Sequence, residues 1–191
     1  MNIPRTFRVT AGALFGAAAL AFLSGCATEA NQPLATVARV DLHRYSGKWY
    51  EVARLKNHFQ HPGEHAMAVY TPVSSTKLLV RNTAITPAGK TRSIQGTAEV
   101  VPGSNGARLR VKFHGLADLV PASEDGNYWI IGIDENYRTS MVATPDRQYL
   151  WILSRDPHLP LGATKAYLTL AAKEGFQMKH LVWDYSQAPA R

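Results

Sequence analysis

The sequence predicts an all-β fold, an eight-stranded antiparallel up-and-down barrel with one C-terminal helix packed outside. Short runs rich in Val, Ile, Tyr, Trp and Thr recur from Asp41 onward, and this composition is typical of strands. Clusters of Gly, Pro, Asn and Asp separate the runs and indicate tight turns. Such short connections leave no room for the crossover helices of a parallel sheet, and closure removes exposed strand edges.

The predicted strands follow one another with turn residues between most of them. Pro87-Ala88-Gly89, Asp134-Glu135-Asn136 and Pro145-Asp146 are examples, because Pro fixes φ while Gly, Asn and Asp tolerate left-handed backbone. The eight strands are expected near residues 49–55, 66–73, 77–85, 91–101, 107–114, 128–134, 138–143 and 148–154.

One helix is predicted after the last of these strands, over residues 161–174 (LGATKAYLTLAAKE). Tyr167, Leu170 and Ala171 lie at helical spacing, and Gly175 is well placed to end the helix. We expect the apolar stripe to pack on the outside of the barrel. The run 180–185 (HLVWDY) predicts a further edge strand.

The first 25 residues have the features of a secretion signal. Arg5 and Arg8 give a positive start, and residues 11–23 form an apolar run that is short for a bilayer-spanning helix. The formal net charge of the chain is +7, but its basic residues are scattered. Scattered basic residues give no footprint for nucleic acid, so no nucleic-acid partner is expected.

The only cysteine, Cys26, comes directly after Leu23-Ser24-Gly25, and this stretch resembles the bacterial lipobox. The resemblance implies cleavage before Cys26 and lipid attachment to it, which would anchor the protein to a membrane. Ala27 stands where many such lipoproteins that stay in the inner membrane have aspartate. The expected location is therefore the bacterial outer membrane, facing the periplasm.

The chain is thus predicted to have four parts. Residues 1–25 are the lipoprotein signal peptide, and 26–40 are the lipidated cysteine with a tether. Residues 41–185 form the barrel domain, and 186–191 are a C-terminal tail.

Three stretches of this domain resemble the lipocalin family. YSGKWYEVAR places Gly47 two residues before Trp49 at the first strand, and DRQYLWILSRDP places Arg155 at the end of the last. IIGIDENYRTSMV puts residues 134–137 where the family has its second signature. Together they resemble the bacterial outer-membrane and apolipoprotein D-like group of lipocalins.

The resemblance implies a structural role for the signature residues. Trp49 would close the narrow end of the barrel, Gly47 would let the entering backbone pass close beneath it, and Arg155 would lie over the indole. Residues 116–127, between the fifth and sixth strands, are longer than expected for close relatives. The family's ligand size and dimer contacts are not carried over to this chain for that reason.

The family resemblance also implies a function. We expect a membrane-anchored lipocalin that binds and stores or transports fatty acids or lysophospholipids for outer-membrane maintenance. No cofactor, bound metal or catalytic residue is expected. Two alternatives stay open, a carrier of haem, pigment or another small apolar ligand, and, with less support, a metal-dependent enzyme.

Strand alternation places Trp49, Glu51 and Ala53 on one face of the first strand, and Tyr50, Val52 and Arg54 on the other. If Trp49 points inward, so does Glu51, which then needs a partner in an internal hydrogen-bond network. The other candidate cavity residues can be interpreted equally well as barrel packing. They are Val69, Val80, Val111, Phe113 and Trp129.

Three histidines lie close together after the first strand. His61-Pro62-Gly63-Glu64-His65 matches the H-x-x-E-H pattern of zinc proteases. Pro62 and Gly63 disfavour the helix that this chemistry needs. With His58, the group leaves open a solvated loop, opportunistic metal binding or a pH-sensitive lid.

An apolar rim at the mouth is also conceivable from the sequence. Phe59, Leu116, Leu119 and Val120 would contact the bilayer or a second subunit, or simply pack within their loops. A homodimer therefore stays open.

Overall fold

A computed structural model of the chain describes residues 32–115 and 121–184. Strands are the main regular structure of these residues, and the fold is the predicted all-β barrel with one long helix. The strands are β1 (Gly47–Leu55), β2 (His65–Ser74), β3 (Lys77–Ile85), β4 (Thr91–Val100), β5 (Arg108–Phe113), β6 (Tyr128–Ile133), β7 (Thr139–Ala143), β8 (Leu150–Ser154) and β9 (Leu181–Trp183).

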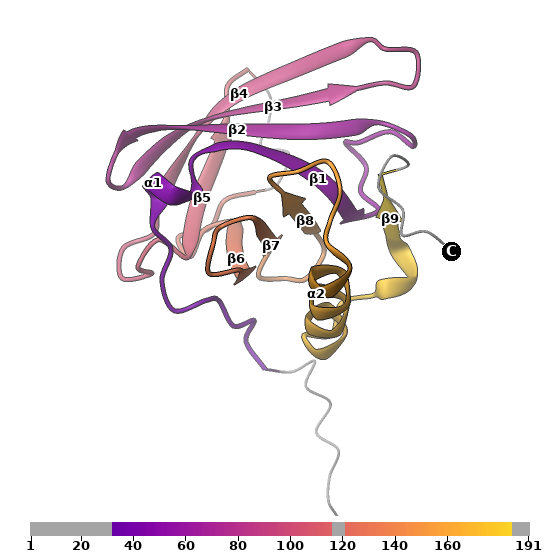
Figure 1. The fold of residues 1–191 in the computed structure, drawn as a ribbon. Coiled ribbons are helices and arrows are strands. Elements are labelled where there is room, and N and C mark those ends of the chain that lie inside the picture. The colour runs from indigo at the N-terminus through magenta and orange to yellow at the C-terminus, as the bar shows by residue number, and fades with distance from the viewer. Residues whose placement is uncertain (1–31, 116–120, 185–191) are drawn as a thin grey trace, which may run out of the picture.

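The strands form one antiparallel sheet in the order β2-β3-β4-β5-β6-β7-β8-β1-β9. β2 also pairs with β1, so the first eight strands close into a barrel (Figure 1). β9 pairs with the end of β1, where Ala53 lies opposite Trp183. The up-and-down order follows from the tight turns that the sequence predicts.

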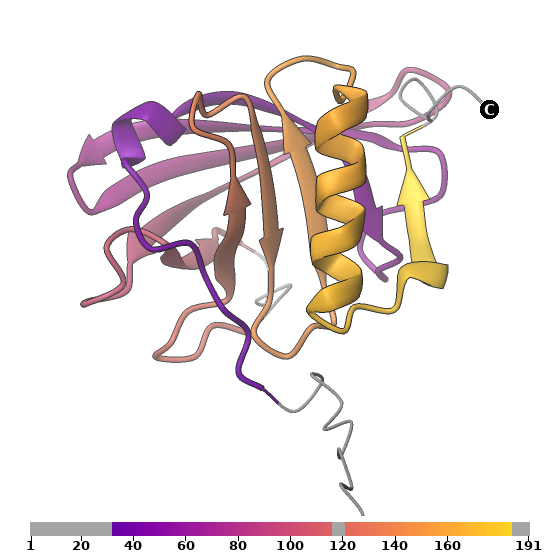
Figure 2. The same cartoon turned by 60° about the horizontal axis from the view of Figure 1, so that its bottom comes forward.

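In the described part of the chain, two α-helices flank the barrel. α1 (Leu42–Tyr45) lies at one end, and α2 (Leu161–Lys173) runs along the outside (Figure 2). A short 3₁₀ helix (Met178–His180) leads into β9. Within the described ranges, no helix has both the length and the apolar character needed to cross a membrane.

α2 packs closely on β6 because a glycine faces it. Tyr167 and Ala171 of α2 are buried, as the helical spacing predicts. A Cβ added to Gly132 of β6 would lie 2.9 Å from the ring of Tyr167. Any larger residue at this position would therefore push the helix away from the sheet.

The side chains form two apolar cores, as expected for strands whose residues alternate between two faces. One core fills the closed end of the barrel interior and contains Trp49, Leu78 and Leu109. The other lies between the barrel wall and α2 and contains Ile152 and Tyr167.

The segment before α1 belongs to the domain, which corrects the predicted tether. Leu34 is buried in the outer core, the Val37 amide donates to the Ile130 carbonyl at 3.0 Å, and the Val40 amide donates to the Asn105 carbonyl at 2.9 Å. The assignment of residues 26–40 to a tether is therefore wrong for 34–40. Cys26 and the signal segment lie outside the described residues.

A β-bulge in β1 changes the predicted alternation. Glu51 lies opposite Leu153 and Ala53 lies opposite Ile152, so Val52 is the extra residue. Val52 and Ala53 consequently both join the outer core, and Arg54 bonds to Glu51. The prediction that Ala53 shares a face with Trp49, opposite Arg54, is wrong because a bulge resets the period of two.

Candidate functional site

The end of the barrel nearest α1 is closed by Trp49 and Arg155. The guanidinium of Arg155 lies 3.8 Å from the centroid of the buried indole. Its Nη1 donates to the Lys48 carbonyl at 2.7 Å, and its Nη2 donates to the Arg44 carbonyl at 2.8 Å. Burial lowers the pKa of Arg155, but an arginine stays charged in proteins. The contact therefore keeps its cation–π character.

Two features favour glycine at position 47, its backbone conformation and the close approach of Arg155. Its φ is +94°, and a Cβ there would lie 3.3 Å from Arg155 Nη1. A residue with a side chain would be strained in this left-handed conformation. The family resemblance implies that Gly47 lets the backbone pass close to Trp49. In the structure, the atom that a side chain at position 47 would approach is Nη1 of Arg155.

A cavity of about 490 Å³ lies inside the barrel beyond this floor. Such a volume is typical of sites for small molecules. Its wall is mostly apolar, and Ala66, Ala68, Ile94 and Leu153 contribute to it. The cavity is thus suited to an apolar molecule.

Four of the six predicted cavity residues line it, namely Glu51, Val80, Val111 and Phe113. Val69 does not, because its neighbours Ala68 and Tyr70 face the cavity and alternation turns Val69 outward.

The prediction that Trp129 lines the cavity is also wrong. It packs against the outer core, and its Nε1 donates to the Asp125 carbonyl at 2.9 Å. The guanidinium of Arg108 lies 5.3 Å from its ring centroid. Trp129 is therefore part of the barrel's outer packing and not of the cavity.

Three tyrosines mark the deep end of the cavity, and sequence reasoning missed them. The hydroxyls of Tyr45 and Tyr128 are 2.7 Å apart, and Tyr70 donates to the Tyr128 hydroxyl at 2.9 Å. Burial raises the pKa of Tyr45 to about 12 and also raises the pKa of Tyr70 and Tyr128. The three phenols are therefore neutral at physiological pH. The inward positions of Tyr70 on β2 and Tyr128 on β6 were the available signal, whereas Tyr45 lies in α1 and had no such signal.

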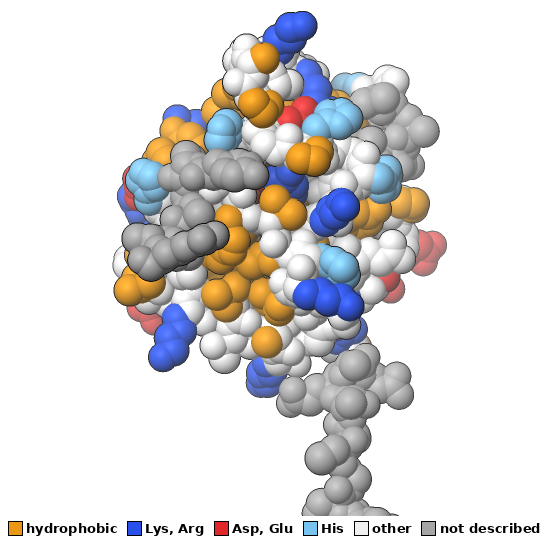
Figure 3. Space-filling view, turned by 90° about the vertical axis from the view of Figure 1, so that its right-hand side faces the viewer, with side chains coloured by type: hydrophobic (Ala, Val, Ile, Leu, Met, Phe, Trp, Pro, Cys, Tyr) orange, Lys and Arg blue, Asp and Glu red, His pale blue; other side chains and the backbone are white. Residues whose placement is uncertain are grey.

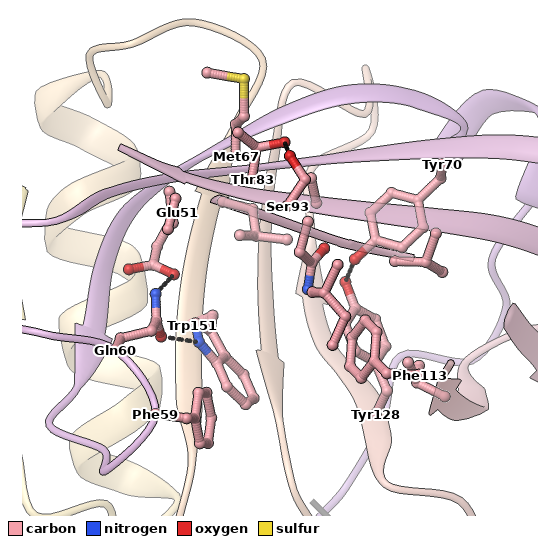
Figure 4. A pocket seen from close by; sticks show the side chains of 18 of the residues that line it. Glu51, Phe59, Gln60, Met67, Tyr70, Thr83, Ser93, Phe113, Tyr128 and Trp151 are labelled. Atoms are coloured by element: carbon pink, nitrogen blue, oxygen red, sulfur yellow. Dashed lines mark hydrogen bonds between the residues drawn. The ribbon is translucent and has the colours of Figure 1, made fainter. Parts of the chain in front are cut away.

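Glu51 forms the polar group at the other side of the cavity, in the kind of internal network that its burial demands. Its Oε1 accepts from Arg54 Nη1 at 2.8 Å, and its Oε2 accepts from Gln60 Nε2 at 2.8 Å. The side chains of Arg54 and Glu51 are only 4% and 7% exposed. Burial raises the pKa of Glu51, while Arg54 and Gln60 oppose that shift. Figure 4 shows Glu51 and Gln60 apart from the Tyr70–Tyr128 pair.

The loop between β1 and β2, residues 56–64, covers part of the mouth. Phe59 and Gln60 of this loop line the cavity, and Trp151 Nε1 donates to Gln60 Oε1 at 3.3 Å. Arg92 of β4 donates to the Phe59 carbonyl at 3.0 Å and to Glu64 Oε2 at 2.6 Å. Hydrogen bonds from Arg92 lower the pKa of Glu64. The loop is thus held from β1, β4 and β8.

The histidines of this region have separate partners. Residues 62–63 form a turn, His65 Nδ1 lies 2.6 Å from Asp184 Oδ1, and Glu64 pairs with Arg92. His58 Nδ1 lies 3.3 Å from the Tyr149 hydroxyl. Residues 32–115 and 121–184 contain no cluster of three or more His, Cys, Asp or Glu able to hold a metal ion. The geometry of a zinc protease is therefore not formed by the H-x-x-E-H residues.

The open end of the barrel has an apolar centre. Figure 3 faces this end and shows hydrophobic side chains near its middle, with Lys, Arg and His side chains around them. Lys56 and Lys90 lie in two of the connections at this end, 56–64 and 86–90, and Arg92 lines the cavity. Leu116, Leu119 and Val120, predicted as rim residues, lie outside the described residues.

Comparisons with known proteins agree with this geometry. Residues 40–186 match the family model of the lipocalin-like domain. The chain is 33% identical over 173 residues to the outer membrane lipoprotein Blc of Escherichia coli (strain K12), covering 89% of this chain and 94% of that protein. It is 30% identical over 126 residues to apolipoprotein D of Oryctolagus cuniculus, covering 63% of each.

Solved structures show the same fold. The amine-binding protein of Rhodnius prolixus, solved as its tryptamine complex, has a TM-score of 0.57 and 16% identity, covering 80% of this chain and 85% of that one. At this identity the likeness concerns the fold alone. Together with the family match and the relationship to Blc, the closed barrel establishes that the chain belongs to the lipocalin family.

Proposed function

We propose that this lipocalin is anchored to the outer membrane, where it binds and stores or transports fatty acids or lysophospholipids for membrane maintenance. The observation that carries the proposal is the cavity of about 490 Å³, whose wall is mostly apolar. Binding and release need no catalytic step, so the proposed protein is a carrier and not an enzyme.

Burial of an acyl chain supplies the driving force. Each buried methylene contributes about 0.8 kcal/mol, so a sixteen-carbon chain contributes on the order of 10 kcal/mol before the costs of binding. The remainder corresponds to dissociation constants of about micromolar or tighter. Such affinities suit reversible carriage between membranes.

The polar groups favour one orientation of the ligand. Glu51 already has Arg54 and Gln60 as partners, so a ligand head group is not needed to satisfy it. Lys56 and Lys90 lie at the open end, and Arg92 lines the cavity there. A carboxylate or phosphate head group would be attracted to this end, with the acyl chain pointing toward the tyrosines.

The anchor is proposed from the lipobox-like stretch at Cys26 and from the relative in Escherichia coli, which is an outer membrane lipoprotein. Replacement of Cys26 by serine should abolish incorporation of labelled palmitate into the protein and leave the signal segment uncleaved. Equal palmitate labelling of Cys26→Ser and the wild type would contradict the anchor while leaving ligand binding untouched.

Two adjacent residues of β2 allow a matched test of the cavity. Ala68 lines the cavity and Val69 does not, so Ala68→Trp fills the site while Val69→Trp adds the same ring outside it. We expect Ala68→Trp to weaken palmitate binding at least about 10-fold in a fluorescent fatty-acid displacement assay, and Val69→Trp to leave it unchanged. Equal affinities of the two variants would refute the cavity as the site.

A further inference from the structure

Asn82 differs from the other polar side chains that line the cavity. Glu51 bonds to Gln60, Tyr70 to Tyr128, and Thr83 to Ser93 (Figure 4). The remaining pairs are Trp151 with Gln60, Arg92 with Glu64, and Asn127 with the backbone of Val111. Among the described residues, none bonds to the Asn82 amide, whose Oδ1 is buried.

The surroundings of Asn82 explain why it has no partner. Its neighbours across the sheet are Ala68 on β2 and Ile94 on β4, and both line the cavity. Val80 and Ala84, two residues away on β3, line it as well. A single amide thus stands in an apolar ring of side chains.

The Oδ1 of Asn82 is buried and lacks a hydrogen bond within the described residues, which disfavours asparagine at this position. Burying a polar group without a hydrogen bond is unfavourable, and an aliphatic residue of similar size would suit the apolar ring better. Packing therefore does not account for asparagine at this site, whereas a hydrogen bond to a bound ligand does.

The depth of Asn82 shows which part of a ligand can reach it. Asn82 lies opposite Ala68, which in turn lies opposite Trp49. Arg92, at the open end, lies opposite Ala84, which is two residues beyond Asn82 along β3, a rise of about 7 Å. A head group held at the mouth is therefore above Asn82, and the amide faces the acyl chain.

We propose that Asn82 is a specificity-determining residue that hydrogen-bonds to a hydroxyl group on the acyl chain, so that the preferred ligands are hydroxylated fatty acyl chains. A hydroxyl both donates and accepts, so it pairs with either orientation of the amide. This inference rests on the proposed function, because it assumes that an acyl chain occupies the cavity.

The test compares stearate with octadecanoic acids that carry a hydroxyl at carbon 2, 3, 10 or 12. Dissociation constants are measured by calorimetry for the wild type, Asn82→Leu and the control Ala84→Leu, which adds volume to the same wall but keeps the amide. We expect at least one hydroxylated isomer to bind the wild type about 5- to 10-fold more tightly than stearate, the effect of one hydrogen bond. Ala84→Leu should keep that preference.

Asn82→Leu should bind stearate at least as tightly as the wild type and should lose the preference, with an unfolding temperature no lower than that of the wild type. Stearate binding the wild type as tightly as every isomer would overturn the inference, as would a preference that persists in Asn82→Leu. If neither stearate nor any isomer binds, the proposed function fails and this inference falls with it.

Discussion

Replacement of Arg155 tests whether the floor of the barrel is a structural element. The guanidinium contributes a cation–π contact with Trp49 at 3.8 Å, about 1–2 kcal/mol for a partly desolvated pair. It also donates to the carbonyls of Lys48 and Arg44 at 2.7 and 2.8 Å. We assign about 1 kcal/mol to each of these partly exposed bonds. Arg155→Ala should therefore lower the free energy of unfolding by about 3 kcal/mol.

The assay is urea unfolding of a soluble form that begins at Ala27, followed by tryptophan fluorescence. In thermal unfolding, the same loss of stability corresponds to a fall in the melting temperature of about 6–12 °C for a domain of this size. Arg155→Lys keeps the charge but lacks the planar fork, so it should restore only part of the loss. A change below about 0.5 kcal/mol for Arg155→Ala, or full rescue by lysine, would refute this description of the floor.

Other perturbations concern the first strand. Gly47→Ala should lower the free energy of unfolding in urea by about 1–2 kcal/mol, since φ is +94° and the new Cβ meets Arg155. An unchanged midpoint of urea unfolding would contradict this. Arg54→Met leaves the buried Glu51 without its ionic partner and should lower the free energy of unfolding by about 3–5 kcal/mol at pH 8. The double variant Arg54→Met with Glu51→Gln should stay within about 1 kcal/mol of the wild type. Equal losses in the two variants would show that the pair is not coupled. Because burial raises the pKa of Glu51, the folded protein keeps a proton that the unfolded chain releases near pH 4.3. The stability of the wild type relative to the double variant should therefore fall as pH rises above about 4.3, and a rise would have the wrong sign.

The closed barrel was predictable because its causes are local. Alternating apolar strands, turn residues and a single helical stripe each act over a few residues, and the structure has the strands and α2 within a few residues of the predicted bounds. Trp49 and Arg155 were paired only through the family resemblance. Nothing in their spacing of about a hundred residues indicates a contact.

The errors arose where the chain departs from a simple period or where partners come from distant segments. The bulge at Val52 reversed the expected faces of Ala53 and Arg54, and no residue type in β1 marks a bulge. The polar residues around Leu34 predict a tether, whereas Leu34 packs in the outer core. The unpaired state of Asn82 depends on neighbours from β2 and β4, which only the register of the folded sheet brings together.

The central claim is that the cavity holds one acyl-chain ligand. Native mass spectrometry of the soluble form beginning at Ala27, purified without detergent and titrated with palmitate and with lysophospholipid, tests it most directly. We expect saturable one-to-one adducts in the wild type and in Val69→Trp, and their loss in Ala68→Trp. The absence of an adduct with any single-chain lipid, or equal adducts in both variants, would contradict the claim.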